Sequence, residues 1–374
     1  MKKDGRFSRR DFLKTGPAAF AVAAATPSWL SARPASGLAL EHGVLGRTGL
    51  RVTSVSLGCM VAPEEVIAAA VDRGVNWLDT AHVYKNGQNE GEVGRVMRGR
   101  RDTAYISTKI RSGNKQTMQS QIDTSLTRLQ TDYVDNLMIH DVRNRAQVFN
   151  ETNLEVLEEA KQAGKTRFVG FSTHNNMAET INAAAESDHY DIILTSFNFS
   201  IANPALLEAV AKAHAAGIGI IAMKTQLGDF PNPEGGLTPH QAALKWVLEN
   251  EHVTCAVPGT RDFQQLDQNL AVMGQRLGYF EGRELERYAA ATSGLLCTDC
   301  GTCEGACPNG VDIRDVRRCA MYLEGYRDPG LARENYRQVA LNARPCADCT
   351  ECAVLCTAGA ALQPLLSRTH AQLA

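Results

Sequence analysis

The feature that most constrains the fold is an alternation of β-rich and helical runs between about Leu40 and Leu277. The β-rich runs cover residues 52–57, 77–80, 104–109, 133–140, 168–172, 192–198, 218–224 and 255–258. Each is followed by a helical run, over residues 64–72, 90–97, 117–129, 154–162, 178–186, 204–215, 239–249 and 263–277. Strands that alternate with helices indicate a parallel sheet, and eight such units predict an α/β fold of the (β/α)8 TIM-barrel class. An open doubly wound sheet is the alternative, but no Gly-rich G-x-G-x-x-G turn follows the first strand.

Composition excludes several other classes of protein. The 374 residues are 44% hydrophobic, which is enough for a large core and excludes a disordered, collagen-like or coiled-coil chain. The formal net charge of −2 argues against a nucleic-acid-binding protein, which would need a basic face. No apolar run reaches the roughly 18 residues that a membrane-spanning helix needs.

The first 39 residues resemble a bacterial export signal. A basic start is followed by Ser8-Arg9-Arg10-Asp11-Phe12-Leu13-Lys14, which resembles the twin-arginine motif S-R-R-x-F-L-K, and then by an Ala-rich stretch. The resemblance implies recognition by the twin-arginine export machinery, export in the folded state, and a periplasmic or exported location. Cleavage after Ala39 would remove seven basic and two acidic residues and change the net charge from −2 to −7, whereas cleavage near Ala32 stays an alternative. An acidic mature protein is not expected to have a nucleic-acid partner.

Four polar residues lie at or just beyond the carboxyl ends of consecutive predicted strands. Asp79 and Tyr84 follow the second strand, Lys109 ends the third and His140 ends the fourth. Each alone could be structural, but in a barrel these strand ends meet at the face that carries active sites. A nearby ammonium lowers the pKa of a tyrosine from its ordinary value near 10, and a histidine can orient a carbonyl oxygen. The set therefore predicts protonation of a carbonyl group while a hydride arrives from elsewhere.

The same region resembles the aldo-keto reductase family. The segment 45–52, Leu-Gly-Arg-Thr-Gly-Leu-Arg-Val, resembles the family's N-terminal signature. Asp79, Tyr84, Gly87 and Glu90 match the family pattern D-T-A-x-x-Y-x-x-G-x-x-E. The resemblance covers about residues 40–277 and implies an oxidoreductase that acts on a small carbonyl or alcohol substrate.

The resemblance also implies a role for each of the four polar residues. Tyr84 would be the general acid, and Lys109 would lower the pKa of its hydroxyl. Asp79 would pair with Lys109, and His140 would position the substrate carbonyl.

NADP or NAD is the cofactor that the resemblance implies. The residues that align with the family's nicotinamide, pyrophosphate and adenosine contacts are Ser172, Ser196, Met223, Lys224, Thr225, Leu227, Gly259, Thr260, Arg261, Gln265 and Asn269. Two of them depart from the family, since Gly259 replaces a basic residue and Gln265 replaces an arginine. Only Arg261 remains for a 2′-phosphate, so the choice between NADP and NAD stays open. Capping of the eighth helix by Thr260 and Arg261 is the structural alternative.

Eight of the 11 cysteines lie in two runs with the same spacing. Cys297-x2-Cys300-x2-Cys303-x3-Cys307-Pro308 is the bacterial ferredoxin run, and Cys346-x2-Cys349-x2-Cys352-x3-Cys356 repeats it. Zinc sites favour separate C-x2-C pairs, and a disulfide framework does not fit this spacing. In two-cluster ferredoxins the fourth cysteine of each run binds the other cluster. The spacing therefore predicts two [4Fe–4S] clusters, one on Cys297, Cys300, Cys303 and Cys356 and the other on Cys346, Cys349, Cys352 and Cys307.

These features divide the chain into three parts. We expect a signal over residues 1–39, a barrel over 40–282 and a small, mainly helical ferredoxin-like domain over 283–374. Helical runs at 313–325 and 331–341 lie between the two cysteine runs.

Two functions remain open at this point. The first is NAD(P)-linked carbonyl reduction or alcohol oxidation with Tyr84 as general acid/base, combined with two clusters that connect to a redox partner. The second is an exported iron–sulfur electron-transfer protein whose barrel binds a ligand or partner without nicotinamide turnover. The substrate, the direction of reaction and the oligomeric state are not predicted.

Overall fold

The computed structural model describes residues 40–226, 239–292, 297–298, 300–339 and 342–374. The predicted signal over 1–39 and the predicted cofactor contact Leu227 lie outside the described residues. The described residues belong to one compact unit.

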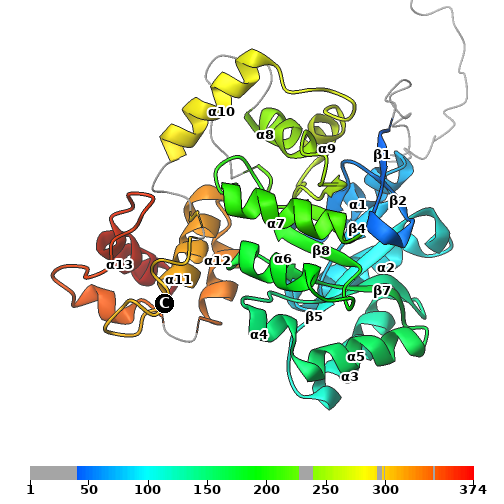
Figure 1. Cartoon of the computed structure of the whole chain (residues 1–374), viewed down its shortest axis with the longest axis horizontal. Helices are drawn as coiled ribbons and strands as arrows, with labels where there is room; N and C mark the ends of the chain where they lie inside the picture. Colours follow the sequence, from blue (N-terminus) through cyan, green and yellow to red (C-terminus); the bar gives the residue numbers. More distant parts are fainter. Residues whose placement is uncertain (1–39, 227–238, 293–296, 299, 340–341) are drawn as a thin grey trace, which may run out of the picture. The chain divides into compact units, whose positions relative to one another are not determined.

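Eight parallel strands form the barrel that the alternation predicts (Figure 1). They are β3 (Leu57–Gly58), β4 (Trp77–Asp79), β5 (Tyr105–Ile110), β6 (Val134–Ile139), β7 (Thr166–Thr173), β8 (Ile192–Ser196), β9 (Gly219–Met223) and β10 (Cys255–Ala256). Each strand pairs with the next in chain order. Parallel bridges from Val55 to Ala256 and from Gly58 to Gly259 connect the two edges, so the sheet is a nearly closed barrel.

Helices follow the strands and cover the outside of the barrel (Figure 1). They are α1 (Glu64–Asp72), α2 (Gln88–Met97), α3 (Lys115–Leu129), α4 (Arg145–Val148), α5 (Glu151–Gln162), α6 (Met177–Ala185), α7 (Pro204–Ala215), α8 (Pro239–Leu248) and α9 (Phe263–Leu270). Asparagine side chains accept from backbone N–H groups at the starts of α3, α5 and α7, which satisfies donors that a helix leaves unpaired there. The predicted helix over 263–277 ends early, at Leu270.

The first predicted strand, 52–57, is wrong in part. Residues 51–53 form β2 (Arg51–Thr53), which pairs antiparallel with β1 (His42–Val44) in a separate hairpin. The hairpin and its connecting segment place Leu45, Leu50 and Val52 against interior side chains of the barrel such as Trp77. Burial of this apolar set against the barrel interior fixes the hairpin, and only Leu57–Gly58 remains to pair with β4.

The chain after the barrel is helical, in agreement with the sequence prediction. It contains α10 (Tyr279–Thr292), α11 (Ile313–Ala320), a π-helical turn (Met321–Gly325), α12 (Pro329–Tyr336) and α13 (Leu362–Leu373). Helices α11, α12 and α13 pack on one another around Val316, Tyr336 and Leu366 (Figure 1). The predicted boundary between residues 282 and 283 falls inside α10, and the division into domains stays a prediction.

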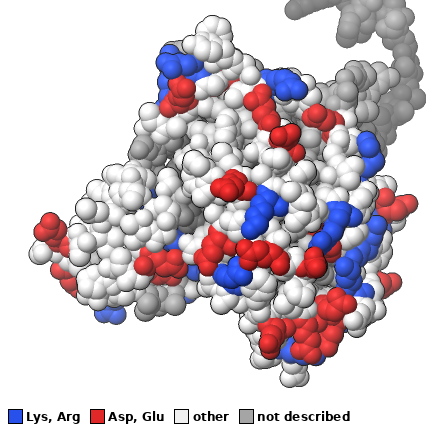
Figure 2. Space-filling view, viewed as in Figure 1, with Lys and Arg blue, Asp and Glu red and all other residues white. Residues whose placement is uncertain are grey.

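Two further observations concern the surface. Within the described ranges no helix is long and apolar enough to cross a membrane. On the face shown in Figure 2, Lys and Arg side chains are interspersed with Asp and Glu.

Candidate active site

The four polar residues predicted from the strand ends lie together in the structure. Lys109 Nζ donates to Asp79 Oδ2 at 2.6 Å, to the carbonyl of Thr80 at 2.7 Å and to the Tyr84 hydroxyl at 3.4 Å. The ring of His140 meets the ring of Tyr84 edge to face, with centroids 5.8 Å apart. Lys109 is almost fully buried, so its charge acts where solvent screens it little.

Burial and charge set the protonation states of this group. Burial raises the pKa of Tyr84, and the ammonium of Lys109 lowers it only in part, so the net shift is upward. The predicted lowering by Lys109 is therefore present but does not dominate. Burial alone would lower the pKa of Lys109, but the charges of Asp79 and Tyr84 outweigh it and raise the pKa. Burial, and then the charge of Lys109, holds the pKa of His140 well below 6.5. Near neutral pH the group therefore combines a protonated tyrosine, a charged lysine and a neutral histidine.

A tight turn after β4 positions Tyr84. Lys85 and Asn86, directly after it, have φ angles of 49° and 54°, in the left-handed region that non-glycine residues rarely adopt. Lys85 Nζ holds the turn through the Ala62 carbonyl at 3.0 Å and Glu92 at 2.8 Å. Backbone strain of this kind is typical of functional sites, where the surrounding structure maintains it.

The rest of the motif after Tyr84 supports the turn from behind. Gly87 has a φ of 86°, and a Cβ there would lie 2.2 Å from the guanidinium carbon of Arg128. Arg128 in turn pairs with the buried carboxylate of Glu90 at 3.3 Å, which also accepts from Thr108 at 2.6 Å. The absence of a side chain at Gly87 therefore leaves room for the guanidinium of Arg128, and the carboxylate of Glu90 neutralises its charge.

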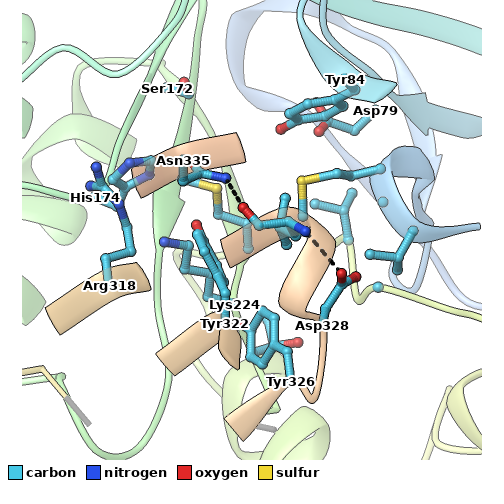
Figure 3. Close-up of a pocket in the computed structure, with 18 of the residues that line it drawn as sticks. Asp79, Tyr84, Ser172, His174, Lys224, Arg318, Tyr322, Tyr326, Asp328 and Asn335 are labelled. Carbon is cyan, nitrogen blue, oxygen red and sulfur yellow. Dashed lines mark hydrogen bonds between the residues drawn. The ribbon is translucent and has the colours of Figure 1, made fainter. Parts of the chain in front are cut away.

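A cavity of about 1210 Å³ opens beside these residues, with Asp79, Tyr84 and His140 in its wall. Figure 3 shows Asp79 and Tyr84 at this cavity. Pockets for small ligands usually measure about 300–1,000 Å³, so this one has room for a dinucleotide together with a substrate. The predicted cofactor residues that line it are Ser172, Met223, Lys224, Thr225, Gly259, Arg261, Gln265 and Asn269.

Two predicted cofactor residues stand apart from the cavity wall. Ser196 is buried, and Thr260 is buried and accepts from Asn269 Nδ2 at 3.1 Å. The hydroxyls of Ser196 and Thr225 are buried polar atoms without a hydrogen-bond partner. Such groups cost free energy unless a ligand or water satisfies them, and Thr225 also lines the cavity. The residues present therefore fit a bound nicotinamide nucleotide.

Sequence reasoning missed the part of the cavity wall that comes from the helical region. The residues of this region that line the same cavity as the barrel residues are Asp315, Arg318, Tyr322, Tyr326 and Asp328, the last four of which are labelled in Figure 3. Tyr322 belongs to the π-helical turn, and Lys224 Nζ lies 5.5 Å from the centre of its ring. Single π-helical turns are frequent at functional sites. The sequence signal that could have indicated this wall is the charged run over residues 314–318. A helix in which nearly every residue is charged must place some of those charges against other parts of the protein when it packs on two sides.

A network of charged groups connects this wall to the strand ends. Arg143 donates to Asp141 at 2.6 Å and to Asp315 at 2.7 Å, and Arg318 pairs with Asp315 at 2.7 Å. His174 Nε2 lies 2.9 Å from Asp141. Burial outweighs the attraction of Asp141 and lowers the pKa of His174 to about 4, so this histidine is neutral.

The eight cysteines of the two runs gather into the two sets predicted from their spacing. Cys297, Cys300, Cys303 and Cys356 line one small cavity, to which Arg314 and Arg317 also contribute. In the second set, burial and then the neighbouring thiols of Cys307, Cys349 and Cys352 raise the pKa of Cys346 to about 11. None of the 11 cysteines, all of which lie in the described ranges, forms a disulfide bond. Among the described residues no group of three or more His, Cys, Asp or Glu side chains is arranged to hold a single metal ion.

Comparison with known proteins places the barrel among oxidoreductases. Residues 62–230 match the model of the Aldo/keto reductase family. The chain is 24% identical over 282 residues to L-galactose dehydrogenase of Arabidopsis thaliana, a match that covers 63% of the chain and 88% of that relative. It is 32% identical over 149 residues to an uncharacterized oxidoreductase of Bacillus subtilis, which covers 34% of the chain and 47% of that protein.

Solved structures support the fold. An aldo-keto reductase of Bacillus halodurans in its holo form matches with a TM-score of 0.55 at 23% identity, over 67% of the chain and 96% of that protein. An aldo-keto reductase of Klebsiella pneumoniae in complex with NADPH matches with a TM-score of 0.55 at 22% identity, over 67% of the chain and 95% of that protein. Together the matches support an oxidoreductase enzyme and do not favour a barrel that serves electron transfer without catalysis.

Proposed function

We propose that this oxidoreductase reduces a carbonyl compound, or oxidises the matching alcohol, with NADP or NAD and with Tyr84 as general acid/base. The match of residues 62–230 to the Aldo/keto reductase family model and the similarity to L-galactose dehydrogenase support this proposal. The observation that carries this proposal is the contact of Lys109 with both Asp79 and the Tyr84 hydroxyl, beside a cavity large enough for cofactor and substrate.

The residues of the chain would act on the carbonyl oxygen. A bound nicotinamide supplies or accepts the hydride at the carbonyl carbon. Tyr84 gives its hydroxyl proton to the carbonyl oxygen as the C=O π bond opens, and new C–H and O–H bonds form. Lys109, held by Asp79, stabilises the phenolate that Tyr84 leaves behind. Neutral His140 donates an N–H to the same oxygen and stabilises its developing negative charge.

Substitution of Tyr84 tests this mechanism. Tyr84→Phe keeps the ring against His140 and removes the acid, so we expect the rate of carbonyl reduction to fall by about 10²–10⁴ with nucleotide binding retained. Tyr326→Phe is the matched control, since it removes a hydroxyl from the same cavity wall without touching the proposed acid. Unchanged reduction by Tyr84→Phe would contradict the proposed role. The substrate screen would begin with L-galactose, because a relative of the chain is a dehydrogenase of that sugar.

We further propose that the two cysteine sets bind two [4Fe–4S] clusters and exchange electrons with a redox partner. The spacing of the runs and the gathering of the same sets in the structure support this proposal. Eight thiolates can hold two such clusters, each of which transfers one electron.

Iron and sulfide analysis tests the cluster proposal. Anaerobically purified protein should contain about eight iron atoms per chain, and Cys356→Ala should lose about half of them. Cys319→Ala is the matched control, because Cys319 is buried in the same region but belongs to neither run. Full iron content in Cys356→Ala would contradict the assignment of that ligand.

We propose that residues 1–39 direct the folded chain through the twin-arginine pathway to the periplasm. Arg9→Lys combined with Arg10→Lys should leave the precursor in the cytoplasm, as followed by cell fractionation. Continued export of that variant would contradict the proposal.

A further inference from the structure

An ion pair in the cavity wall joins the barrel to the helical region. Arg261 Nη2 lies 3.3 Å from Oδ2 of Asp328, which stands just before α12. The other carboxylate oxygen of Asp328 accepts from the backbone N–H of Leu331 at 2.9 Å (Figure 3). Asp328 is therefore held in place by the start of a helix while its charge meets Arg261.

The position of this pair follows from the chemistry at the opposite end. The reacting ring of a nicotinamide nucleotide must lie beside Tyr84 and His140, because the hydride moves there. The adenosine end then lies away from Tyr84, toward the residues that follow β10, where Arg261 and Gln265 line the cavity. In Figure 3, Tyr84 lies at the top of the view and Asp328 lies apart from it, below.

Charges of both signs meet at this end, where Arg261 and Arg327 line the cavity together with Asp262 and Asp328. Gly259 and Gln265 are neutral, so Arg261 is the basic residue of the segment that follows β10. Asp262 and Asp328 both line the cavity beside it. A 2′-phosphate carries nearly two negative charges, so it would have to displace Asp328 from Arg261 or lie next to two carboxylates. A ribose 2′-hydroxyl can instead donate to a carboxylate, which is how acidic residues recognise NAD in other dinucleotide sites.

We propose that Asp328, supplied by the helical region rather than by the barrel, makes the enzyme select NAD(H) over NADP(H). The carboxylate occupies Arg261 and excludes the 2′-phosphate, and it accepts a hydrogen bond from the 2′-hydroxyl of NAD(H). This inference rests on the proposed nicotinamide site.

Binding titrations with NADH and NADPH test the proposal on the full, cluster-loaded chain. Asp328→Asn is the informative variant, because asparagine caps a helix as well as aspartate does and only the charge is lost. We expect the wild type to bind NADH at least about tenfold more tightly than NADPH, and Asp328→Asn to bind NADPH about tenfold more tightly than the wild type does. The added variant Arg261→Ala should abolish that gain, because the gain depends on a freed arginine. Glu334→Gln is the matched control, since it removes another carboxylate from the cavity wall and should leave the ratio unchanged.

The outcomes separate this inference from the function on which it rests. An unchanged NADH-to-NADPH ratio in Asp328→Asn, or a wild type that prefers NADPH, would overturn the role of Asp328 and leave the nicotinamide site standing. Failure of both nucleotides to bind the wild type would overturn the nicotinamide site itself.

Discussion

Arg317 donates a hydrogen bond from Nη1 to the Sγ of Cys356 at 3.2 Å, so a buried guanidinium lies against one of the proposed cluster ligands. Hydrogen bonds and positive charge at a cluster sulfur stabilise the reduced, more negative state and raise the reduction potential. In the second set, the contact to Cys349 Sγ comes from the neutral amide of Asn309, at 3.3 Å. The two proposed clusters therefore have unequal surroundings.

Substitution of Arg317 should lower the reduction potential of the cluster on the Cys356 set and leave the potential of the other cluster unchanged. We expect Arg317→Gln to lower the potential of the cluster on the Cys356 set by about 60 mV or more, which matches the loss of one hydrogen bond to a charged group. A redox titration followed by electron paramagnetic resonance measures this shift. Arg337→Gln removes an exposed charge from the same region and is the control. Equal shifts of both clusters, or no shift, would contradict the unequal surroundings.

Removal of the charge on Lys109 should affect activity and stability separately. Lys109→Met leaves the buried carboxylate of Asp79 without its partner, which should cost about 3–5 kcal/mol of unfolding free energy, and the rate of reduction should fall at least about 10²-fold. The double variant Asp79→Asn, Lys109→Met removes both charges and should recover most of the stability but none of the activity. Denaturant unfolding and steady-state kinetics measure the two effects. Recovery of activity in the double variant would show that the ammonium is not needed for proton transfer.

The pH dependence of the two reaction directions should differ. Carbonyl reduction needs protonated Tyr84, and because burial raises the pKa of Tyr84, its rate should stay level from neutral pH to about pH 10. Alcohol oxidation needs the phenolate, so its rate should rise by about tenfold per pH unit over the same range. Burial holds the pKa of His140 well below its ordinary value of about 6.5. We therefore expect no fall in the rate of carbonyl reduction as the pH drops through 6.5. Steady-state kinetics in both directions measure these rates. A fall in the rate of carbonyl reduction between pH 7 and 8 would contradict the prediction, because it would mean that Tyr84 is already ionised in that range.

The barrel and four catalytic candidates could be predicted from sequence because both depend on local patterns. Strand and helix runs repeat eight times, and a barrel brings successive strand ends to one face, so Asp79, Lys109 and His140 had to converge. The first strand was misassigned because 52–57 has one continuous β-rich pattern, and only tertiary packing separates the hairpin from β3. Cysteine spacing predicts the two ligand sets because ferredoxin-type runs are local motifs, and their binding of clusters stays a prediction.

The wall formed by Asp315, Arg318 and Tyr322 could not be predicted in the same way. Asp315 lies 172 positions after Arg143, to which it bonds. Tyr322 likewise lies far along the chain from Lys224, whose ammonium faces its ring. A local pattern carries no information on which surface a helix will pack against. The net direction of the pKa shift at Tyr84 was also missed, since it depends on burial that the sequence does not show.

Acidification should destabilise the protein through His174. Its pKa is lowered to about 4 in the folded state against about 6.5 when unfolded, so the unfolded state binds more protons between these values and stability falls as pH falls through 6.5. From pH 7.5 to 6.0 the expected loss is about 0.8 kcal/mol, which His174→Asn should abolish and the exposed control His42→Asn should not. Denaturant unfolding at the two pH values measures it. An equal loss in wild type and His174→Asn would assign the pH dependence to other groups.

Helix α11 has neighbours on two sides, since Arg314 and Arg317 line the cysteine cavity while Asp315 and Arg318 line the catalytic cavity. If the clusters bind as proposed, iron loading would hold the same helix that completes the wall of the nucleotide site. A chain that had not received its iron would then present an open, incomplete site, and nucleotide affinity would report on the maturation of the protein before any electron is transferred.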